Sequence, residues 1–205
     1  MVATYRKVDS LKNLMRMGLN VHDNVITNNI VEAMDAVRKF GRFTVRTDIN
    51  INTTEGWGNG TQLPFIMQKR ETENTDLIQE QLRDLIYRGY MLIITDGIKH
   101  DEIQDYNAVA TIYKNGDYKV EVSTKKVPLR KMYSYDGIFI AEGNICDNVW
   151  NTRFYGNVDY DRKSIIKDMQ ELYTKEIYGR AIEFTKYPID VGIRKERLVF
   201  WQIRN

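Results

Sequence analysis

The hydrophobic and polar positions along the chain predict a mixture of helices and strands. Apolar residues spaced three and four apart, as on one face of a helix, recur in four segments that each end at a glycine: 10–17, 30–40, 77–88 and 164–178. Alternating or continuous apolar runs, typical of strands, occupy 43–49, 90–95, 108–113, 118–123, 138–141, 181–185 and 198–203. Asn115-Gly116 separates two of these strands and predicts a hairpin turn. The pattern therefore predicts an α+β fold.

The length and the loops of the chain favour a single domain. A chain of 205 residues suits one domain, or two small lobes that share a core. We expect one domain over residues 1–205, with approximate lobes at 1–70 and 71–205. The most loop-like segment, 50–64, contains Gly56, Gly58 and Gly60. It is either an ordinary surface loop or a flap whose backbone N–H groups approach phosphate oxygens.

Charge and composition exclude several classes of protein. Lys and Arg number 30 and Asp and Glu 28, so the net charge is only +2, which argues against a strongly basic nucleic-acid protein and against an acidic disordered chain. The single cysteine, Cys146, permits no intramolecular disulfide. The sequence shows neither a secretory signal nor an apolar run long enough to span a membrane, so we expect a cytoplasmic protein that has no membrane partner.

The common catalytic and metal-binding motifs are not found. His22, His100 and Cys146 lack the spacing of a zinc site, and neither a phosphate-binding P-loop nor a dinucleotide-binding glycine motif occurs. A catalytic triad is not excluded by spacing, but no nucleophile elbow is present. Residues 125–135 combine four cations with two tyrosines, the residue types that neutralise phosphates and stack on bases. This segment is either a solvated loop or a surface that binds nucleic acid or protein.

Two motifs near the start of the chain resemble the ATP-grasp nucleotide-binding domain of pyruvate phosphate dikinase and phosphoenolpyruvate synthase. The first runs from Lys7 through Leu11 to the turn Gly18-Leu19-Asn20-Val21, where that family has a lysine, a leucine and a proline-containing turn. The second is the strand end that contains Arg46, followed here by Thr-Asp rather than by two small residues. The resemblance implies that Lys7 and Arg46 contact the phosphates of ATP and act in catalysis. Their alternative roles are a basic residue before a helix and a structural ion pair.

Two further motifs extend the resemblance to the middle and the end of the chain. The strand 90–95 with the residues after it is similar to the hinge that receives adenine, which implies nucleotide contacts at Thr95, Asp96 and Ile98. The closing motif pairs a Glu on one strand with a Gln and an Arg on the next. The resemblance implies metal binding by Glu183 and Gln202 and nucleotide binding by Arg204. Glu183 and Gln202 are equally compatible with ordinary half-exposed positions of alternating strands.

This resemblance implies an ATP-grasp-like fold, with two small α+β lobes of mostly antiparallel sheets around a nucleotide cleft. The implied cofactors are ATP and Mg²⁺, and the implied activity is kinase-type phosphotransferase or ligase chemistry on a small-molecule or protein acceptor. We expect no complete dikinase reaction, because 205 residues leave no room for the family's phosphohistidine carrier domain and pyruvate-binding barrel. The alternatives are a non-catalytic relative, a module that binds nucleic acid or protein, and a structural protein of a phage or mobile element.

Overall fold

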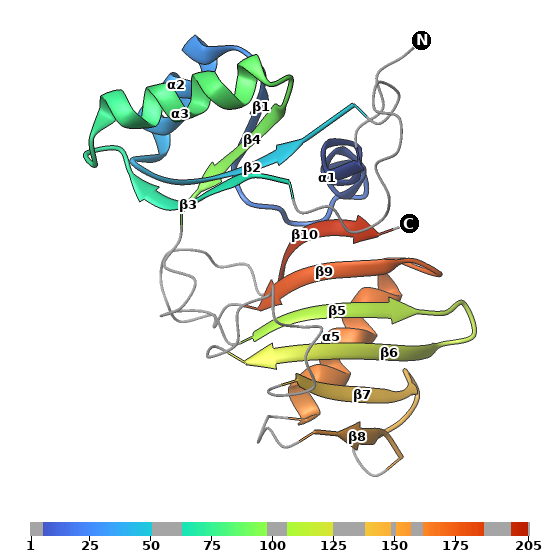
Figure 1. The fold of residues 1–205 in the computed structure, drawn as a ribbon. Helices are drawn as coiled ribbons and strands as arrows, with labels where there is room; N and C mark the ends of the chain where they lie inside the picture. The colour runs from blue at the N-terminus through green and yellow to red at the C-terminus, as the bar shows by residue number, and fades with distance from the viewer. Residues whose placement is uncertain are drawn as a thin grey trace. The chain divides into compact units, whose positions relative to one another are not determined.

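The computed structural model describes residues 6–50, 63–97, 106–124, 138–148, 151–156, 162–186 and 198–204. The chain divides into two compact units: unit 1 contains Met1–Met17 and Val21–His100, and unit 2 contains Gly18–Asn20 and Asp101–Asn205. Each unit combines an antiparallel sheet with helices (Figure 1). The predicted α+β fold class is therefore confirmed.

Unit 1 is built on a four-stranded antiparallel sheet in the order β1-β4-β2-β3. Its strands are β1 (Asn24–Thr27), β2 (Arg42–Asp48), β3 (Phe65–Arg70) and β4 (Met91–Asp96). Because β4 inserts between β1 and β2, the chain that follows β3 returns to the same sheet. The lobe boundary expected at residue 70 thus falls inside unit 1. The assignment of the whole chain to one domain stays a prediction.

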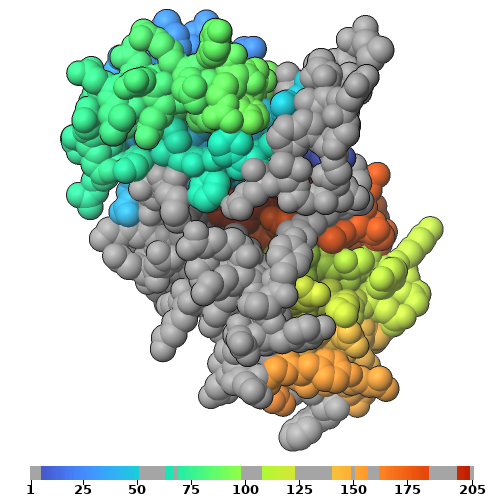
Figure 2. Space-filling view, in the orientation of Figure 1, coloured from blue at the N-terminus to red at the C-terminus, as the bar shows by residue number. Residues whose placement is uncertain are grey.

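Three helices cover the two faces of this sheet: α1 (Arg6–Arg16), α2 (Ile30–Phe40) and α3 (Thr75–Tyr87). Helices α2 and α3 lie side by side on one face (Figure 1), where Val37, Leu82 and Leu92 belong to one buried cluster. The outer side of α3, green in Figure 2, is open to solvent, and Tyr87 is 91 % exposed. Helix α1 packs on the other face against Ile93, whose side chain alternates with that of Leu92 along β4.

The start of α2 gives a first testable prediction. Asn29 precedes the helix, and its Oδ1 accepts hydrogen bonds from the N–H groups of Val31 at 2.8 Å and Glu32 at 3.4 Å. We expect Asn29→Ala to lower the free energy of unfolding by about 1 kcal/mol, because these N–H groups lose their acceptor. Chemical denaturation measures the change. Substitution of the exposed neighbour Asn28 by alanine should change stability by less than about 0.5 kcal/mol, and equal losses in the two variants would contradict the capping role.

Unit 2 is built on a six-stranded antiparallel sheet in the order β10-β9-β5-β6-β7-β8. Its strands are β5 (Tyr106–Ile112), β6 (Asp117–Thr124), β7 (Ile138–Asn144), β8 (Arg153–Tyr155), β9 (Ala181–Lys186) and β10 (Leu198–Arg204). The predicted turn at Asn115-Gly116 is confirmed, and Gly116 adopts the positive φ of 89° that such a turn requires. Helix α5 (Arg162–Thr174) lies across one face of the sheet (Figure 1) and ends four residues before the expected position.

The two faces of the unit 2 sheet differ in polarity. On one face, Ala108 is paired with Phe184 and Val122, and all three side chains are buried. Helix α5 covers this apolar face, where alanines leave room for its side chains. The opposite face carries half-exposed or exposed polar side chains, among them Lys119, Glu121, Glu142, Glu183 and Gln202. The sheet therefore offers one polar surface on which charged groups can face a ligand.

Candidate nucleotide and metal site

Glu183 and Gln202 are direct cross-strand partners on the polar face of unit 2. Both side chains are half-buried, and Glu183 is also opposite Val109 of β5. Directly opposite residues of antiparallel strands have Cβ atoms about 5 Å apart, so the carboxylate and the amide are neighbours. A joint role in metal binding requires neighbouring strands in this register, and the structure provides it. Arg204 follows on the same strand, where its backbone pairs with Ala181.

A β-bulge in β10 places Gln202 opposite Glu183. Phe200 is opposite Phe184 and Gln202 is opposite Glu183, so Trp201 is an extra residue between the two pairs. In a regular strand Trp201 would be opposite Glu183, and Gln202 would turn toward the buried face, since a one-residue slip moves each side chain to the other face. The bulge therefore decides which of the two side chains lies beside the Glu183 carboxylate.

The Glu183–Gln202 pair suits a hard cation that is also bound by phosphates. A carboxylate and an amide carbonyl offer oxygen ligands, and Mg²⁺ is typically held by one or two protein groups together with nucleotide phosphates. Within the residues that the structure describes, no three His, Cys, Asp or Glu side chains form a metal-binding group. Oxygens of nucleotide phosphates would complete the coordination of a cation held by this pair. Glu121 is the next carboxylate in the same row, beyond Val109.

The same face carries a salt bridge between Lys119 and Glu142, with an N–O distance of 3.2 Å. The hydrogen bond from Lys119 to Glu142, together with the negative charge of that carboxylate, raises the pKa of Lys119. Glu142 thus has a cationic partner on the protein itself. It lies on β7, three strands away from Glu183 in the sheet order, which makes it a suitable control position for substitutions at Glu183.

In unit 1, the first turn of α1 brings Lys7 to the end of β2, the strand that contains Arg46. The carboxylate of Asp48, 2 % exposed, accepts hydrogen bonds from the backbone N–H groups of Lys7 at 2.7 Å and Val8 at 2.9 Å. The Lys7 ammonium group donates to the carbonyl oxygen of Thr47 at 2.8 Å, one residue after Arg46. Arg46 is half-buried and lies on the sheet face that α1 covers. The two predicted phosphate-binding cations thus belong to neighbouring positions of unit 1.

The Thr-Asp sequence after Arg46 has a structural explanation. Thr47 Oγ1 donates a hydrogen bond to the carbonyl oxygen of Pro64, and Asp48 anchors the positive end of α1. Sequence reasoning missed both roles, because their partners are distant in the chain. The sequence signal for the role of Asp48 is an acidic residue at the end of a buried strand. This signal does not indicate which helix the carboxylate caps.

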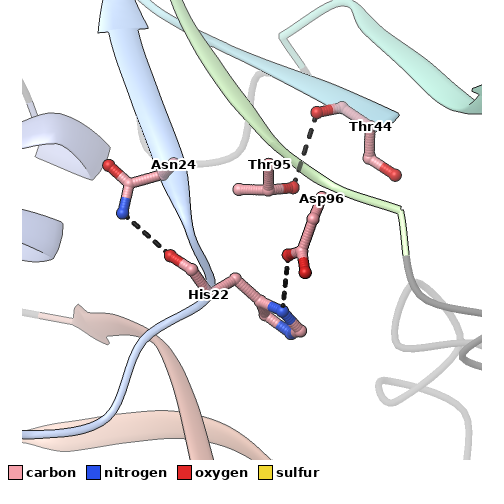
Figure 3. Close-up of polar contacts among 5 residues, drawn as sticks. All are labelled: His22, Asn24, Thr44, Thr95 and Asp96. Atoms are coloured by element: carbon pink, nitrogen blue, oxygen red, sulfur yellow. Dashed lines mark hydrogen bonds and ion pairs between the residues drawn. The ribbon is translucent and has the colours of Figure 1, made fainter. Parts of the chain in front are cut away.

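The predicted hinge residues Thr95 and Asp96 already have side-chain partners in unit 1 (Figure 3). Thr95 Oγ1 donates to the carbonyl oxygen of Thr44 at 3.5 Å. Asp96 Oδ1 lies 3.1 Å from Nδ1 of His22, a side chain that is 2 % exposed. Asn24 in turn donates to the His22 carbonyl oxygen at 2.9 Å. These side chains therefore fix the end of β4.

The backbone of the predicted hinge limits how adenine could bind there. The N–H of Asp96 donates to the carbonyl oxygen of Asp23 at 3.2 Å, and the N–H of Gly97 donates to that of Arg42 at 2.6 Å. Adenine recognition at this position would therefore use carbonyl oxygens or the following residue, Ile98. Ile98 lies outside the residues that the structure describes.

Other sequence predictions also fall outside the described residues. These are the loop around Gly56, Gly58 and Gly60 and the cation-rich segment 125–135, and nothing in the structure bears on the nucleic-acid alternative. The side chain of Arg204 is likewise outside the description. In the described ranges no helix is both long and apolar enough to cross a membrane. The cytoplasmic location stays a prediction.

Comparisons with known proteins find similarity in structure alone. No protein-family model and no curated protein sequence matches the chain. Among solved structures, it is similar to the macrocyclase MdnC from Microcystis aeruginosa, bound with its precursor peptide MdnA, at 13 % identity and a TM-score of 0.48, covering 96 % of this chain and 51 % of that one. It is also similar to an ATP-grasp ligase from Chryseobacterium gregarium, in complex with ADP and a leader and core peptide, at 13 % identity and a TM-score of 0.49, covering 94 % and 49 %.

A third similar structure is D-alanyl-alanine synthetase A from Vibrio cholerae, at 10 % identity and a TM-score of 0.47, covering 97 % of this chain and 54 % of that one. The chain thus spans about half the length of these three enzymes. Similarity at these identities and TM-scores assigns neither a family nor an activity, and the resemblance to the dikinase domain stays a prediction. The case for a function therefore rests on the residues themselves.

Proposed function

We propose that the protein binds ATP together with Mg²⁺ and uses it for ligase-type or phosphotransferase chemistry. The observation that carries this proposal is the cross-strand pairing of Glu183 with Gln202 on the polar face of unit 2. The resemblance of the closing motif assigns metal binding to these two residues. The bulge makes Gln202 the cross-strand partner of Glu183, so two adjacent strands supply side chains with oxygen ligands.

Lys7 and Arg46 are proposed to neutralise the phosphates. ATP carries several negative charges, for which an ammonium group acts as a point charge and a guanidinium group as a planar fork of donors. Their common location at the end of β2 supports a joint role. Thr95, Asp96 and Ile98 are proposed to line the adenine site, and Arg204 to contact the nucleotide.

The proposed reaction depends on positioning and charge rather than on a protein nucleophile. Bound Mg²⁺ would neutralise charge on the phosphates and orient the transferred group. The acceptor would be either a carboxylate, activated as an acyl phosphate, or another group of a small molecule or protein. In unit 2, Glu183 of β9 and Gln202 of β10 would hold the metal ion.

Nucleotide binding tests this proposal. Thermal unfolding with ATP and Mg²⁺ should show stabilisation by about 2.7 kcal/mol when the ligand is at 100 times its dissociation constant. Lys7→Ala and Arg46→Ala should each weaken ATP binding by about tenfold, because each removes a charge-assisted contact with a phosphate. Lys12→Ala removes an exposed cation from the same helix and should leave binding unchanged. The absence of any shift at millimolar ATP and Mg²⁺ would contradict the proposal.

A further inference from the structure

Asn20 binds the outer edge of β10, the strand that carries Gln202. Residues Gly18–Asn20 belong to unit 2, although the chain before and after them belongs to unit 1. The Asn20 side-chain Nδ2 donates to the carbonyl oxygen of Leu198 at 3.0 Å, and the N–H of Phe200 donates to the Asn20 carbonyl oxygen at 2.8 Å. Asn20 thus satisfies one acceptor and one donor of the strand edge, as a residue of a neighbouring strand would.

The contact lies directly before the bulge. Phe200 is the last residue of β10 in the first register, and Trp201 is the extra residue that shifts the register for Gln202. Strand β10 is at the edge of its sheet, with β9 on its other side. An edge strand that is paired on one side only can shift its register more easily than a central one. The hydrogen bonds of Asn20 with Leu198 and Phe200 therefore oppose movement of the bulge.

We propose that Asn20 is a positioning residue for Gln202. By holding Leu198 and Phe200, it keeps the bulge at Trp201 and so keeps the Gln202 amide beside the Glu183 carboxylate. This inference rests on the proposed function, in which Gln202 is a metal ligand. The contact with the Leu198 carbonyl oxygen depends on the asparagine side chain, which supplies an amide donor.

Two substitutions at Asn20 test the inference, with a matched control. Asn20→Ala removes the amide donor, and Asn20→Asp keeps the size of the side chain but places a carboxylate against the Leu198 carbonyl oxygen. Gln170→Ala is the control, because Gln170 Nε2 also donates to a backbone carbonyl oxygen of unit 2, that of Ile145, at 2.8 Å. The readouts are hydrogen exchange of the β10 amides and the Mg²⁺ concentration for half-maximal ATP binding.

In Asn20→Ala, we expect the amides of β10 to exchange about fivefold faster, the effect of losing one hydrogen bond. The Mg²⁺ concentration for half-maximal ATP binding should rise about tenfold, as for other residues that orient a metal ligand. Affinity for ATP without metal should stay the same, a separation that a merely structural role does not produce. Asn20→Asp should give larger changes of both kinds, and Gln170→Ala should give neither.

The outcomes separate this inference from the proposed function. If the wild type binds ATP in a Mg²⁺-dependent manner and the Asn20 variants keep the same Mg²⁺ dependence, the positioning role is overturned and the proposed function stands. Equal weakening of ATP binding with and without Mg²⁺ also overturns it. If the wild type shows no Mg²⁺-dependent binding, the proposed function fails, and the role assigned to Asn20 fails with it.

Discussion

Replacing Asp48 with alanine should lower the free energy of unfolding by about 3 kcal/mol, because a buried charged acceptor and its three hydrogen bonds from backbone N–H groups are lost. The carboxylate binds the backbone N–H groups of Lys7 and Val8 at the start of α1. It also provides a negative charge at the positive end of the helix. Urea denaturation measures the loss. Asp48→Asn should lose about half as much, since one amide oxygen can still accept from both Lys7 and Val8, which share Oδ2, but without the negative charge and without an acceptor for Ile49.

The Asp48 substitution also has a functional consequence. Without its anchor, the first turn of α1 no longer holds Lys7 against the carbonyl oxygen of Thr47. ATP affinity should therefore fall in Asp48→Ala under conditions in which the variant is still folded. Asp35→Ala is the control, because Asp35 is an exposed acidic residue of α2 whose partner is Arg38, and it should change stability by less than about 0.5 kcal/mol. Equal losses in the two variants would contradict the anchoring role of Asp48.

Replacing Glu183 with glutamine should raise the Mg²⁺ concentration needed for ATP binding by about 100-fold or more. The substitution keeps the size and one oxygen of the side chain but removes a full negative charge next to the cation. Loss of a residue that merely orients a metal ligand typically lowers metal affinity 10- to 100-fold. Loss of the ligand itself should lower metal affinity at least as much. Calorimetric titration of Mg²⁺ into protein with a non-hydrolysable ATP analogue measures the effect.

Glu142→Gln is the matched control for this experiment. Glu142 lies on the same polar face of the sheet, and its salt bridge with Lys119 is exposed to solvent. Removing this salt bridge should change stability by less than about 1 kcal/mol and leave the Mg²⁺ dependence as in the wild type. Unchanged Mg²⁺ dependence in Glu183→Gln would remove this carboxylate from the metal site.

Local patterns in the sequence were sufficient for much of the fold. Helix α2 has the predicted bounds, Ile30–Phe40, because an Asn cap and a terminal glycine mark its ends within the sequence itself. Strands β3 and β8 were not predicted. The three residues of β8 are too few to establish a period, and such a strand forms because a neighbouring strand supplies its hydrogen-bond partners.

The candidate site was predictable in its residue types but not in its supporting contacts. The closing motif indicated Glu183 and Gln202, whereas the bulge at Trp201 that brings them together leaves no mark on the apolar alternation. Asn20 contacts Leu198, which is 178 positions away in the chain. Asp48 contacts Lys7 and Val8, which are about 40 positions away. Such contacts depend on which strand lies at an edge and which helix end reaches it, and these are properties of the tertiary structure.

Paramagnetic broadening by Mn²⁺ tests the central claim most directly, because Mn²⁺ can replace Mg²⁺ at an oxygen-ligand site. The measurement is the NMR spectrum of ¹⁵N-labelled protein with substoichiometric Mn²⁺, recorded with and without a non-hydrolysable ATP analogue. We predict that the Gln202 side-chain amide and the backbone amides of Glu183 and its neighbours broaden first, and only when nucleotide is present. Broadening that spares these signals while nucleotide is bound would contradict a metal site at Glu183 and Gln202.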